Sequence, residues 1–236
     1  MSLLEVRNVS KRFGGLSANL DVSFSVGASQ VVGLIGPNGA GKTTLFNCIA
    51  GFYAPSEGSI TIEGNKIGGL SPEACARAGV ARTFQIARTF TSMTACENVM
   101  TAAMLREHHV SRARSNAMQW LAFANLERFA DRPAASMTIS EQRRLAVARA
   151  LAIQPKILLM DEVMAGLNPS EVREAVDVVL KIRDRGISCL IVEHVLEGIM
   201  PIADRIVVLD RGVKIADGTP QHVSSDPAVI SAYLGD

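Results

Sequence analysis

The sequence predicts a three-layer α/β fold, in which helices cover both faces of a mainly parallel sheet. The first observation is that short apolar runs alternate along the chain with longer segments of helical pattern. The second is that these runs are apolar at consecutive positions, which is typical of strands covered on both faces. The third is a glycine-rich segment that follows one run and precedes a helical segment. In such sheets, ligands bind where the carboxyl ends of the strands meet.

Length and composition place the chain among well-folded globular proteins. Its 236 residues are 48% hydrophobic and 20% charged, which allows a substantial core and excludes a disordered chain. The 24 lysines and arginines nearly balance the 23 aspartates and glutamates, giving a net charge of +1. This balance argues against a general nucleic-acid coat protein, and we expect no nucleic acid among the partners.

Cysteine usage and hydropathy predict the compartment. The four cysteines are scattered without a C-x-x-C pair, which indicates reduced thiols in the cytosol rather than a disulfide framework or a zinc site. The first residues lack the apolar stretch of a secretory signal, and no run approaches the ~18 apolar residues of a membrane span. We therefore expect a cytosolic chain that reaches a membrane only through a partner.

Each element of the sheet follows from an apolar run, and each helix from the segment between two runs. The expected strands are Val31 to Ile35, Ile157 to Met160, Cys189 to Val192 and Ile206 to Leu209. The expected helices are Lys42 to Ala50, Glu141 to Ala152, Pro169 to Arg183 and Val195 to Ala203. The last residues, Asp226 to Leu234, predict a short amphipathic helix that packs back on the body.

Two regions depart from this alternation. The run Gly58 to Gly64 alternates between apolar and polar residues, which predicts a half-buried antiparallel strand that could join Leu3 to Val9 in a small β layer. The region Thr94 to Phe129 is rich in alanine, methionine and arginine, and Met118, Leu121 and Leu126 are spaced for one face of a helix. No Gly-, Ser- or Pro-rich linker bounds it. We predict a single domain, with the core and β layer at about residues 1–85 and 132–236 and a helical insertion at about 86–131.

The glycine-rich segment matches the phosphate-binding pattern G-x-x-x-x-G-K-[ST], with an expected strand before it and a helix after it. Its glycines permit a tight turn whose backbone N–H groups face the β- and γ-phosphates, and the helix N-terminus adds partial positive charge. Lys42 would neutralise the phosphates, and the Thr43 hydroxyl would bind Mg²⁺. The alternative is an ordinary glycine-rich turn. The predicted nucleotide-binding residues are Gly36, Pro37, Asn38, Gly39, Ala40, Gly41, Lys42, Thr43 and Thr44.

Polar side chains also end three other expected strands. Asp161 and Glu162 follow one of them: Asp161 would hold Mg²⁺, and Glu162 would activate the attacking water as general base. His194 follows another and would lie near the γ-phosphate, and Gln85 ends the run Val80 to Phe84 and would contact water or the metal. The alternatives are a strand end that turns polar at the surface and a structural histidine.

Taken together and in this order, the phosphate loop, Gln85, Asp161 with Glu162, and His194 closely resemble the ATPase subunits of ABC-type membrane transporters, over nearly the whole chain. The resemblance implies a P-loop (RecA-like) ABC ATPase core with an antiparallel β layer and a helical subdomain insertion. It also implies hydrolysis of ATP with Mg²⁺, driving a membrane transporter. Gln85 would sense the metal and the membrane subunit, and Lys42, Gln85, Glu162 and His194 would form the catalytic set.

The resemblance extends to three further segments. Phe13 would stack on the adenine, the alternative being that it packs under the β layer. Asn168 lies in a segment similar to the family's D-loop, which runs along the interface between two ATPase subunits. In the family, each ATP lies between the P-loop of one subunit and the signature helix of the other. The signature, usually Leu-Ser-Gly-Gly-Gln, aligns with Met137 to Glu141, where Thr138 keeps the hydroxyl but Ser140 replaces the second glycine.

The altered signature predicts either a heterodimer with two unequal sites or a homodimer with slow turnover. A side chain at Ser140 would obstruct the backbone approach to the partner's γ-phosphate. Thr138 and Glu141 also match a helix capping box, so the alternative is that they chiefly start the helix.

Several short strings narrow the resemblance to subunits that serve branched-chain amino acid importers: Lys11 to Gly15, Arg82 to Gln85, Glu141 to Arg144, Ala165 to Pro169, Gly218 to Pro220 and Val229 to Gly235. The implied partners are a second ABC ATPase subunit, integral membrane permease subunits and, indirectly, a substrate-binding protein. The chain would lie in the cytoplasm, peripheral on the cytoplasmic face of the membrane. Met93, Met100 and Met104 would either line a groove that receives a permease helix or pack inside the helical region.

The rival functions are a soluble ABC-type regulatory ATPase with weak turnover, a soluble ABC protein acting on DNA or the ribosome, and a small-molecule kinase. The second would carry a long coiled-coil insertion or tandem ATPase domains, and the third would not explain Gln85, Asn168 and His194. The first is supported by Ser140 and opposed by Glu162 and His194. We predict the ATPase subunit of an importer.

Overall fold

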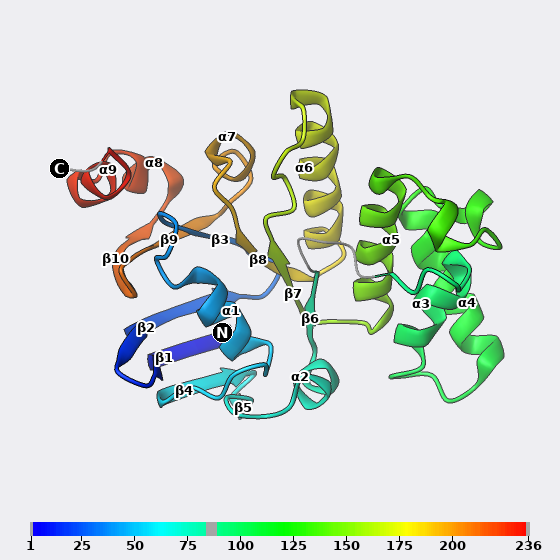
Figure 1. The fold of residues 1–236 in the computed structure, drawn as a ribbon, viewed down its shortest axis with the longest axis horizontal. Helices are drawn as coiled ribbons and strands as arrows, with labels where there is room; N and C mark the ends of the chain where they lie inside the picture. Colours follow the sequence, from blue (N-terminus) through cyan, green and yellow to red (C-terminus); the bar gives the residue numbers. More distant parts are fainter. Residues whose placement is uncertain (1, 84–88, 235–236) are drawn as a thin grey trace.

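The computed structural model describes residues 2–83 and 89–234, which form two sheets with helices around them (Figure 1). The strands are β1 (Ser2–Phe13), β2 (Leu16–Gly27), β3 (Val31–Ile35), β4 (Glu57–Ile62), β5 (Asn65–Lys66), β6 (Val80–Arg82), β7 (Ile157–Asp161), β8 (Ser188–Val192), β9 (Arg205–Asp210) and β10 (Val213–Gly218). The helices are α1 (Lys42–Ile49), α2 (Pro72–Ala78), α3 (Ala95–Ala103), α4 (Val110–Phe123), α5 (Ile139–Ala152), α6 (Pro169–Arg183), α7 (Leu196–Ile199), α8 (Pro220–Ser224) and α9 (Pro227–Leu234), with short 3₁₀ turns at Glu127–Phe129 and Ala134–Ser136.

The larger sheet has the order β10-β9-β3-β8-β7-β6, and all its pairs are parallel except β10 with β9. The four predicted strands are its centre. Side chains of β3 alternate between two cores, because Val32 and Leu34 pack on one face while Val31 and Ile35 pack on the other. This double burial explains why the runs are apolar at every position.

The smaller sheet is antiparallel, with the order β2-β1-β4-β5. It contains the predicted β layer, in which β1 pairs with β4 through Leu4 opposite Ile62 and Val6 opposite Ile60. Strand β2 was not predicted, although Val22, Phe24 and Val26 are buried at alternate positions. That period-2 pattern was the available signal.

Three hydrophobic clusters hold these layers together. The first lies between the two sheets around Leu45, Phe46 and Ile49 of α1, and the second covers the other face of the larger sheet under α5, α6 and α7. The third joins α3 and α4 to α5, and Figure 1 shows these three helices gathered at one end of the molecule. The helical part therefore extends into α5, which also contributes Leu151 to the second cluster.

Two differences from the predicted elements have simple causes. The helix expected at Val195 to Ala203 is regular only over Leu196–Ile199, because Pro201 has no N–H group to donate to the Glu197 carbonyl oxygen. Helix α5 begins at Ile139, two residues before the predicted start, because Thr138 caps it. The four cysteines are free thiols, as predicted, and all four are buried. Within residues 2–83 and 89–234, none of the helices combines the length and the apolar character needed to cross a membrane.

Candidate nucleotide-binding and hydrolysis site

The loop between β3 and α1 can be built only with glycine at two positions. Gly36 has a φ of 147°, and a Cβ there would lie 2.0 Å from the Leu209 carbonyl oxygen. Gly41 has a φ of 95°, and its Cβ would lie 2.4 Å from the Ala18 carbonyl oxygen. At Gly39 (φ 81°) a Cβ would meet nothing within 4 Å. The loop is therefore packed closely against β2 and β9 on its inner side and is open on its outer side.

Lys42 lies inside this loop. Its Nζ donates hydrogen bonds to the carbonyl oxygens of Gly36 (2.6 Å) and Pro37 (2.9 Å), and the residue is 8% exposed. Burial lowers the pKa of Lys42, and the nearby carboxylates of Glu162 and Asp161 oppose that fall. The ammonium group is thus held at the loop in front of two acids.

The first turn of α1 leaves its N–H groups available. No side chain caps the helix at Gly41, and its first turn contains no acidic residue, so the partial positive charge of this end is not neutralised by the helix itself. Thr43 is exposed and Thr44 is half-buried at this end. Of the remaining loop residues, Asn38 is exposed and Ala40 is buried. The predicted phosphate loop thus presents N–H groups, an ammonium and a hydroxyl together.

Asp161 ends β7 and is bound by an arginine that the sequence analysis did not assign to the site. Arg82, the last residue of β6, donates from Nη2 to Oδ2 of Asp161 at 2.7 Å and from Nη1 to Oδ1 of Asn47 at 2.5 Å. The sequence signal for a site role of Arg82 was its position near the end of an expected strand, where ligands bind. Asp161 is therefore fixed to both β6 and α1.

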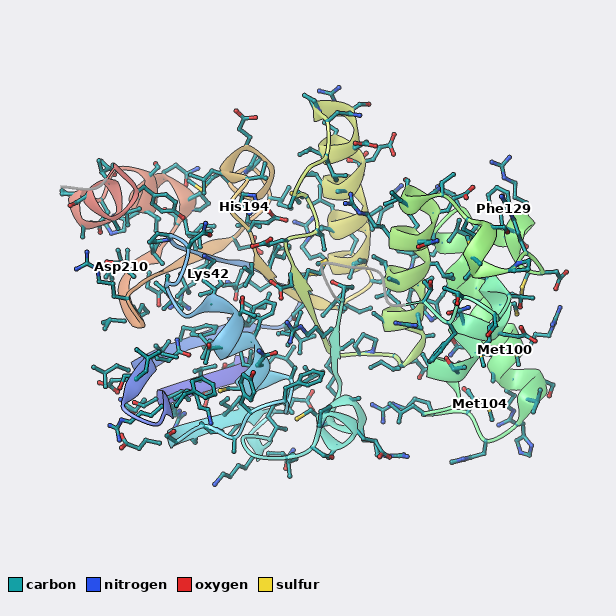
Figure 2. All side chains as sticks on the ribbon, in the orientation of Figure 1. Lys42, Met100, Met104, Phe129, His194 and Asp210 are labelled. Carbon is teal, nitrogen blue, oxygen red and sulfur yellow. The ribbon has the colours of Figure 1, made fainter. Side chains whose placement is uncertain are left out.

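Glu162 and His194 lie together at the ends of β7 and β8. Glu162 has left-handed backbone (φ 51°), and its N–H donates to the Val192 carbonyl oxygen at 2.9 Å. His194 Nδ1 is 3.9 Å from Glu162 Oε1, so the two side chains are neighbours but lie beyond hydrogen-bond range. Figure 2 shows Lys42 and His194 left of the centre of the view, in the part of the molecule that contains α1 and α7. The structure thus brings Lys42, Asp161, Glu162 and His194 together, while Gln85 lies outside the described residues.

Phe13 ends β1 with an exposed ring. It is 42% exposed, so it does not pack under the β layer. Tyr53 meets it edge to face at a centroid distance of 5.2 Å, and the Lys11 ammonium lies 4.9 Å from the centre of the Phe13 ring. Tyr53 was not predicted to belong to the site. The available signal was that two aromatic residues, Phe52 and Tyr53, follow one another in the sequence. The rings form an exposed aromatic surface at the end of β1.

Thr138 and Glu141 form a complete capping box at the start of α5. Thr138 Oγ1 accepts from the Glu141 N–H at 3.2 Å, and Glu141 Oε2 accepts from the Thr138 N–H at 2.7 Å. The hydrogen bond from the Thr138 N–H holds the pKa of Glu141 below its usual value. Ser140 is exposed, and Ile139 is 74% exposed. The predicted capping role is thus present, and the same turn faces outward.

Asn168 begins α6 in a similar way. Its Oδ1 accepts hydrogen bonds from the N–H groups of Ser170 (2.9 Å) and Glu171 (3.1 Å). Asn168 therefore fixes the start of α6, at the end of the loop that begins with Glu162.

A hollow of about 220 Å³ lies between the larger sheet and the helical part. It is lined by Phe52, Arg82, Thr83, Ala102, Arg149 and Ile153, among others. Arg82 thus borders the hollow and also binds Asp161. The predicted methionines do not line it: Met100 packs against the helical cluster, and Met104 is 49% exposed (Figure 2).

Comparison with known proteins gives two family matches along the chain. The family described as ABC transporter matches residues 20–165, and the family described as branched-chain amino acid ATP-binding cassette transporter matches residues 213–236. The chain is 42% identical to the high-affinity branched-chain amino acid transport ATP-binding protein BraF of Pseudomonas aeruginosa, over 99% of this chain and 98% of that protein. It is 40% identical to LivG of Escherichia coli K12, with the same coverage of both chains.

Solved structures give the same result. The ADP conformation of MJ1267, an ATP-binding cassette of an ABC transporter, superimposes with a TM-score of 0.90 and 31% identity over the whole of both chains. The dimeric structure of MJ0796, a bacterial ABC transporter cassette, gives a TM-score of 0.82 and 25% identity over 92% of this chain and 98% of that one. The predicted fold class is therefore confirmed.

Proposed function

The chain belongs to the ABC transporter family of ATP-binding proteins, and from this premise we propose that it powers a membrane importer for branched-chain or similar hydrophobic amino acids. The substrate class is supported by BraF and LivG, whose names give that activity and which match this chain over nearly its whole length. The observation that carries the proposal is the meeting of Lys42, Asp161 and Glu162 at an open phosphate loop. A regulatory ATPase is not favoured by these relatives.

The residues of the loop fit the phosphates of ATP. The open side at Gly39 leaves room for a ligand, and the N–H groups of the loop and of α1 would bind its phosphate oxygens. Lys42 would exchange its two carbonyl partners for phosphate oxygens, which are stronger charge-assisted acceptors. Phe13 would stack on the adenine from the side, with Tyr53 supporting its ring.

The two acids at the end of β7 would have separate roles. Glu162 would take the proton of the attacking water, and His194 beside it would orient the γ-phosphate. Mg²⁺ prefers oxygen ligands, and the exposed Thr43 hydroxyl with the Asp161 carboxylate fits that preference. When bound, Mg²⁺ would neutralise charge on the phosphates. We propose Gln85 as a further ligand.

We propose a second ABC ATPase subunit as the direct partner, and the dimeric cassette among the structural relatives supports such a pair. In this chain Glu141 adds negative charge at the N-terminus of α5, where its carboxylate already accepts the Thr138 N–H. That charge disfavours a phosphate from the partner's site. We therefore favour a heterodimer with unequal sites over a homodimer, with Asn168 near the interface.

The membrane partner would dock at the hollow beside Arg82. A permease segment there would contact Ala102 and Arg149 on one side and Phe52 on the other. The docked segment would lie beside Arg82, whose guanidinium group binds Asp161. In this arrangement the chain lies at the cytoplasmic face of the membrane and is held there by the permease.

The experiment is a mild-detergent pull-down of the tagged chain from native membranes, with the co-purifying proteins identified. We expect multi-span membrane subunits, a second ATPase and a binding protein whose amino acid can then be tested. Ala102→Arg, in the hollow, should lose the membrane subunits, whereas Ala122→Arg, on the exposed face of α4, should keep them. Recovery of the chain alone, or with ribosomes or DNA, would overturn the transport proposal.

A further inference from the structure

Glu193 is a fully buried acid that the roles described above do not use. It follows β8 directly and precedes His194, and it is 0% exposed. Its Oε1 accepts a hydrogen bond from the Met164 N–H at 2.7 Å, whereas Oε2 has no hydrogen-bond partner among the described residues. A buried carboxyl group with one unpaired oxygen is costly, so its retention needs a specific reason.

The loop that Glu193 contacts is the one that presents Glu162. Strands β7 and β8 pair up to Asp161 opposite Val192, and the Glu162 N–H continues this pairing by donating to the Val192 carbonyl oxygen. The chain then turns away from β8. The side chain of Glu193 takes the N–H of Met164, two residues further on, in place of a backbone carbonyl.

Met164 is held on its other side as well. Its side chain is fully buried, and its Sδ lies so close to Gly198 of α7 that a Cβ there would be 2.3 Å away. Glu162 itself has left-handed backbone, which is unfavourable for a residue with a side chain and persists only where the surroundings enforce it. The Glu193–Met164 hydrogen bond and the bond from the Glu162 N–H both attach this loop to the end of β8 and help to enforce it.

We propose that Glu193 is a positioning residue for hydrolysis, which ties the Glu162 loop to β8 and so fixes the Glu162 carboxylate beside the His194 imidazole. The inference rests on the proposed ATPase function of the same site. His194 is the next residue in the chain, so one short segment carries both the imidazole and the attachment of the loop. Burial raises the pKa of Glu193 and the Met164 N–H opposes this rise, so an uncharged acceptor of the same shape should serve as well.

The test compares Glu193→Met, which removes the acceptor at similar volume, with Glu193→Gln, which keeps it. A displacement of the base by about 1 Å would lower kcat by roughly 10- to 100-fold in Glu193→Met, with the KM for ATP unchanged, while Glu193→Gln stays close to wild type. Val179→Ala, on α6 in the same hydrophobic cluster, is the control for lost stability alone. The proposal would be overturned if Glu193→Met and Val179→Ala lost kcat equally at matched stability. It would also be overturned if Glu193→Gln lost as much kcat as Glu193→Met.

Two further measurements do not need ATP hydrolysis. The NMR chemical shifts of the His194 ring should change in Glu193→Met, because the imidazole loses its carboxylate neighbour, and should be unchanged in Val179→Ala. In the wild-type chain, hydrogen exchange at the Met164 amide should be slower than at the exposed amides of the same loop. A Met164 amide that exchanges as fast as they do would refute the positioning role, whereas absent ATPase activity with a protected amide would refute only the proposed function.

Discussion

Arg82 and Asp161 form a buried ion pair at the edge of the larger sheet. The Nη2 to Oδ2 distance is 2.7 Å, and the two side chains are only 9% and 11% exposed. Arg82 also donates to Asn47 and lies over the rings of Phe46 and Phe52. One guanidinium group therefore holds the acid of β7 against the helix that begins at the phosphate loop.

Removing the arginine should destabilise the protein strongly. In Arg82→Met the Asp161 carboxylate loses its charge partner inside the protein, and we expect the free energy of unfolding to fall by about 3–5 kcal/mol. Arg77→Met removes a comparable but exposed pair with Glu73 (3.1 Å) and should cost less than about 1 kcal/mol. Urea denaturation measures both values. Similar losses in the two variants would show that burial does not strengthen the Arg82 pair.

Glu162→Gln should separate ATP binding from hydrolysis. The amide cannot accept the proton of the attacking water, so we expect kcat to fall by about 10²- to 10⁴-fold, the range typical of a general base. ATP affinity should not fall, because Glu162 does not belong to the phosphate loop and its neutralisation removes negative charge near Lys42. Glu197→Gln, an exposed glutamate of α7, is the control and should keep wild-type turnover. Turnover above a tenth of wild type in Glu162→Gln would exclude Glu162 as the base.

Phe13→Ala should weaken ATP binding through the base rather than the phosphates. Stacking of a base on an aromatic ring contributes about 1–3 kcal/mol, so the Kd for ATP should rise accordingly, and Phe13→Trp should restore it. Affinity for inorganic triphosphate, which has no base, should not change. Phe129→Ala removes a ring of the helical part (Figure 2) and serves as the control. An equal loss for ATP and triphosphate would mean that Phe13 supports the loop instead.

Most of the fold could be predicted because its strongest signals are local. The runs of β3, β7 and β8 are buried on both faces, and this leaves an unbroken apolar pattern in the sequence. Strand β10 has no fully buried position and leaves no such pattern. The early end of α7 follows from Pro201, whose missing N–H is a local signal against a helix that continues to Ala203.

The candidate site was predictable where one motif holds the chemistry, as in the phosphate loop and at Asp161. The residues that the analysis missed act through contacts that are distant in sequence. Arg82 reaches Asp161 across 79 positions, and Glu193 reaches Met164 across 29. A single sequence contains no pattern that joins such pairs. Their role follows only from the way the strand ends meet.

The capping box of α5 should make stability depend on pH in the acid range. The pKa of Glu141 is lower in the folded chain than its usual value of 4.5, chiefly through the Thr138 N–H, so its contribution is complete above that value and is lost as pH falls through the lower folded pKa. Between about pH 6 and pH 3, Glu141→Gln should therefore lose less stability than the wild type. Glu97→Gln, in the matching box of Thr94, should behave likewise. Parallel curves for wild type and Glu141→Gln would contradict this.

Ser140→Gly tests whether the altered signature limits turnover. Ser140 is exposed in the first turn of α5, so the substitution opens the backbone to a partner's phosphate without removing a buried contact. One additional N–H contact in the transition state is worth on the order of 1.4 kcal/mol, and we expect about a tenfold rise in the ATPase rate of the chain paired with itself. Combining it with Glu141→Gln should add to the gain, because the carboxylate no longer repels the phosphate. Ser111→Gly, an exposed serine in the first turn of α4, controls for helix effects and should give no gain. If Ser140→Gly also gives none, the signature does not limit turnover, and the argument from it for a heterodimer with unequal sites fails.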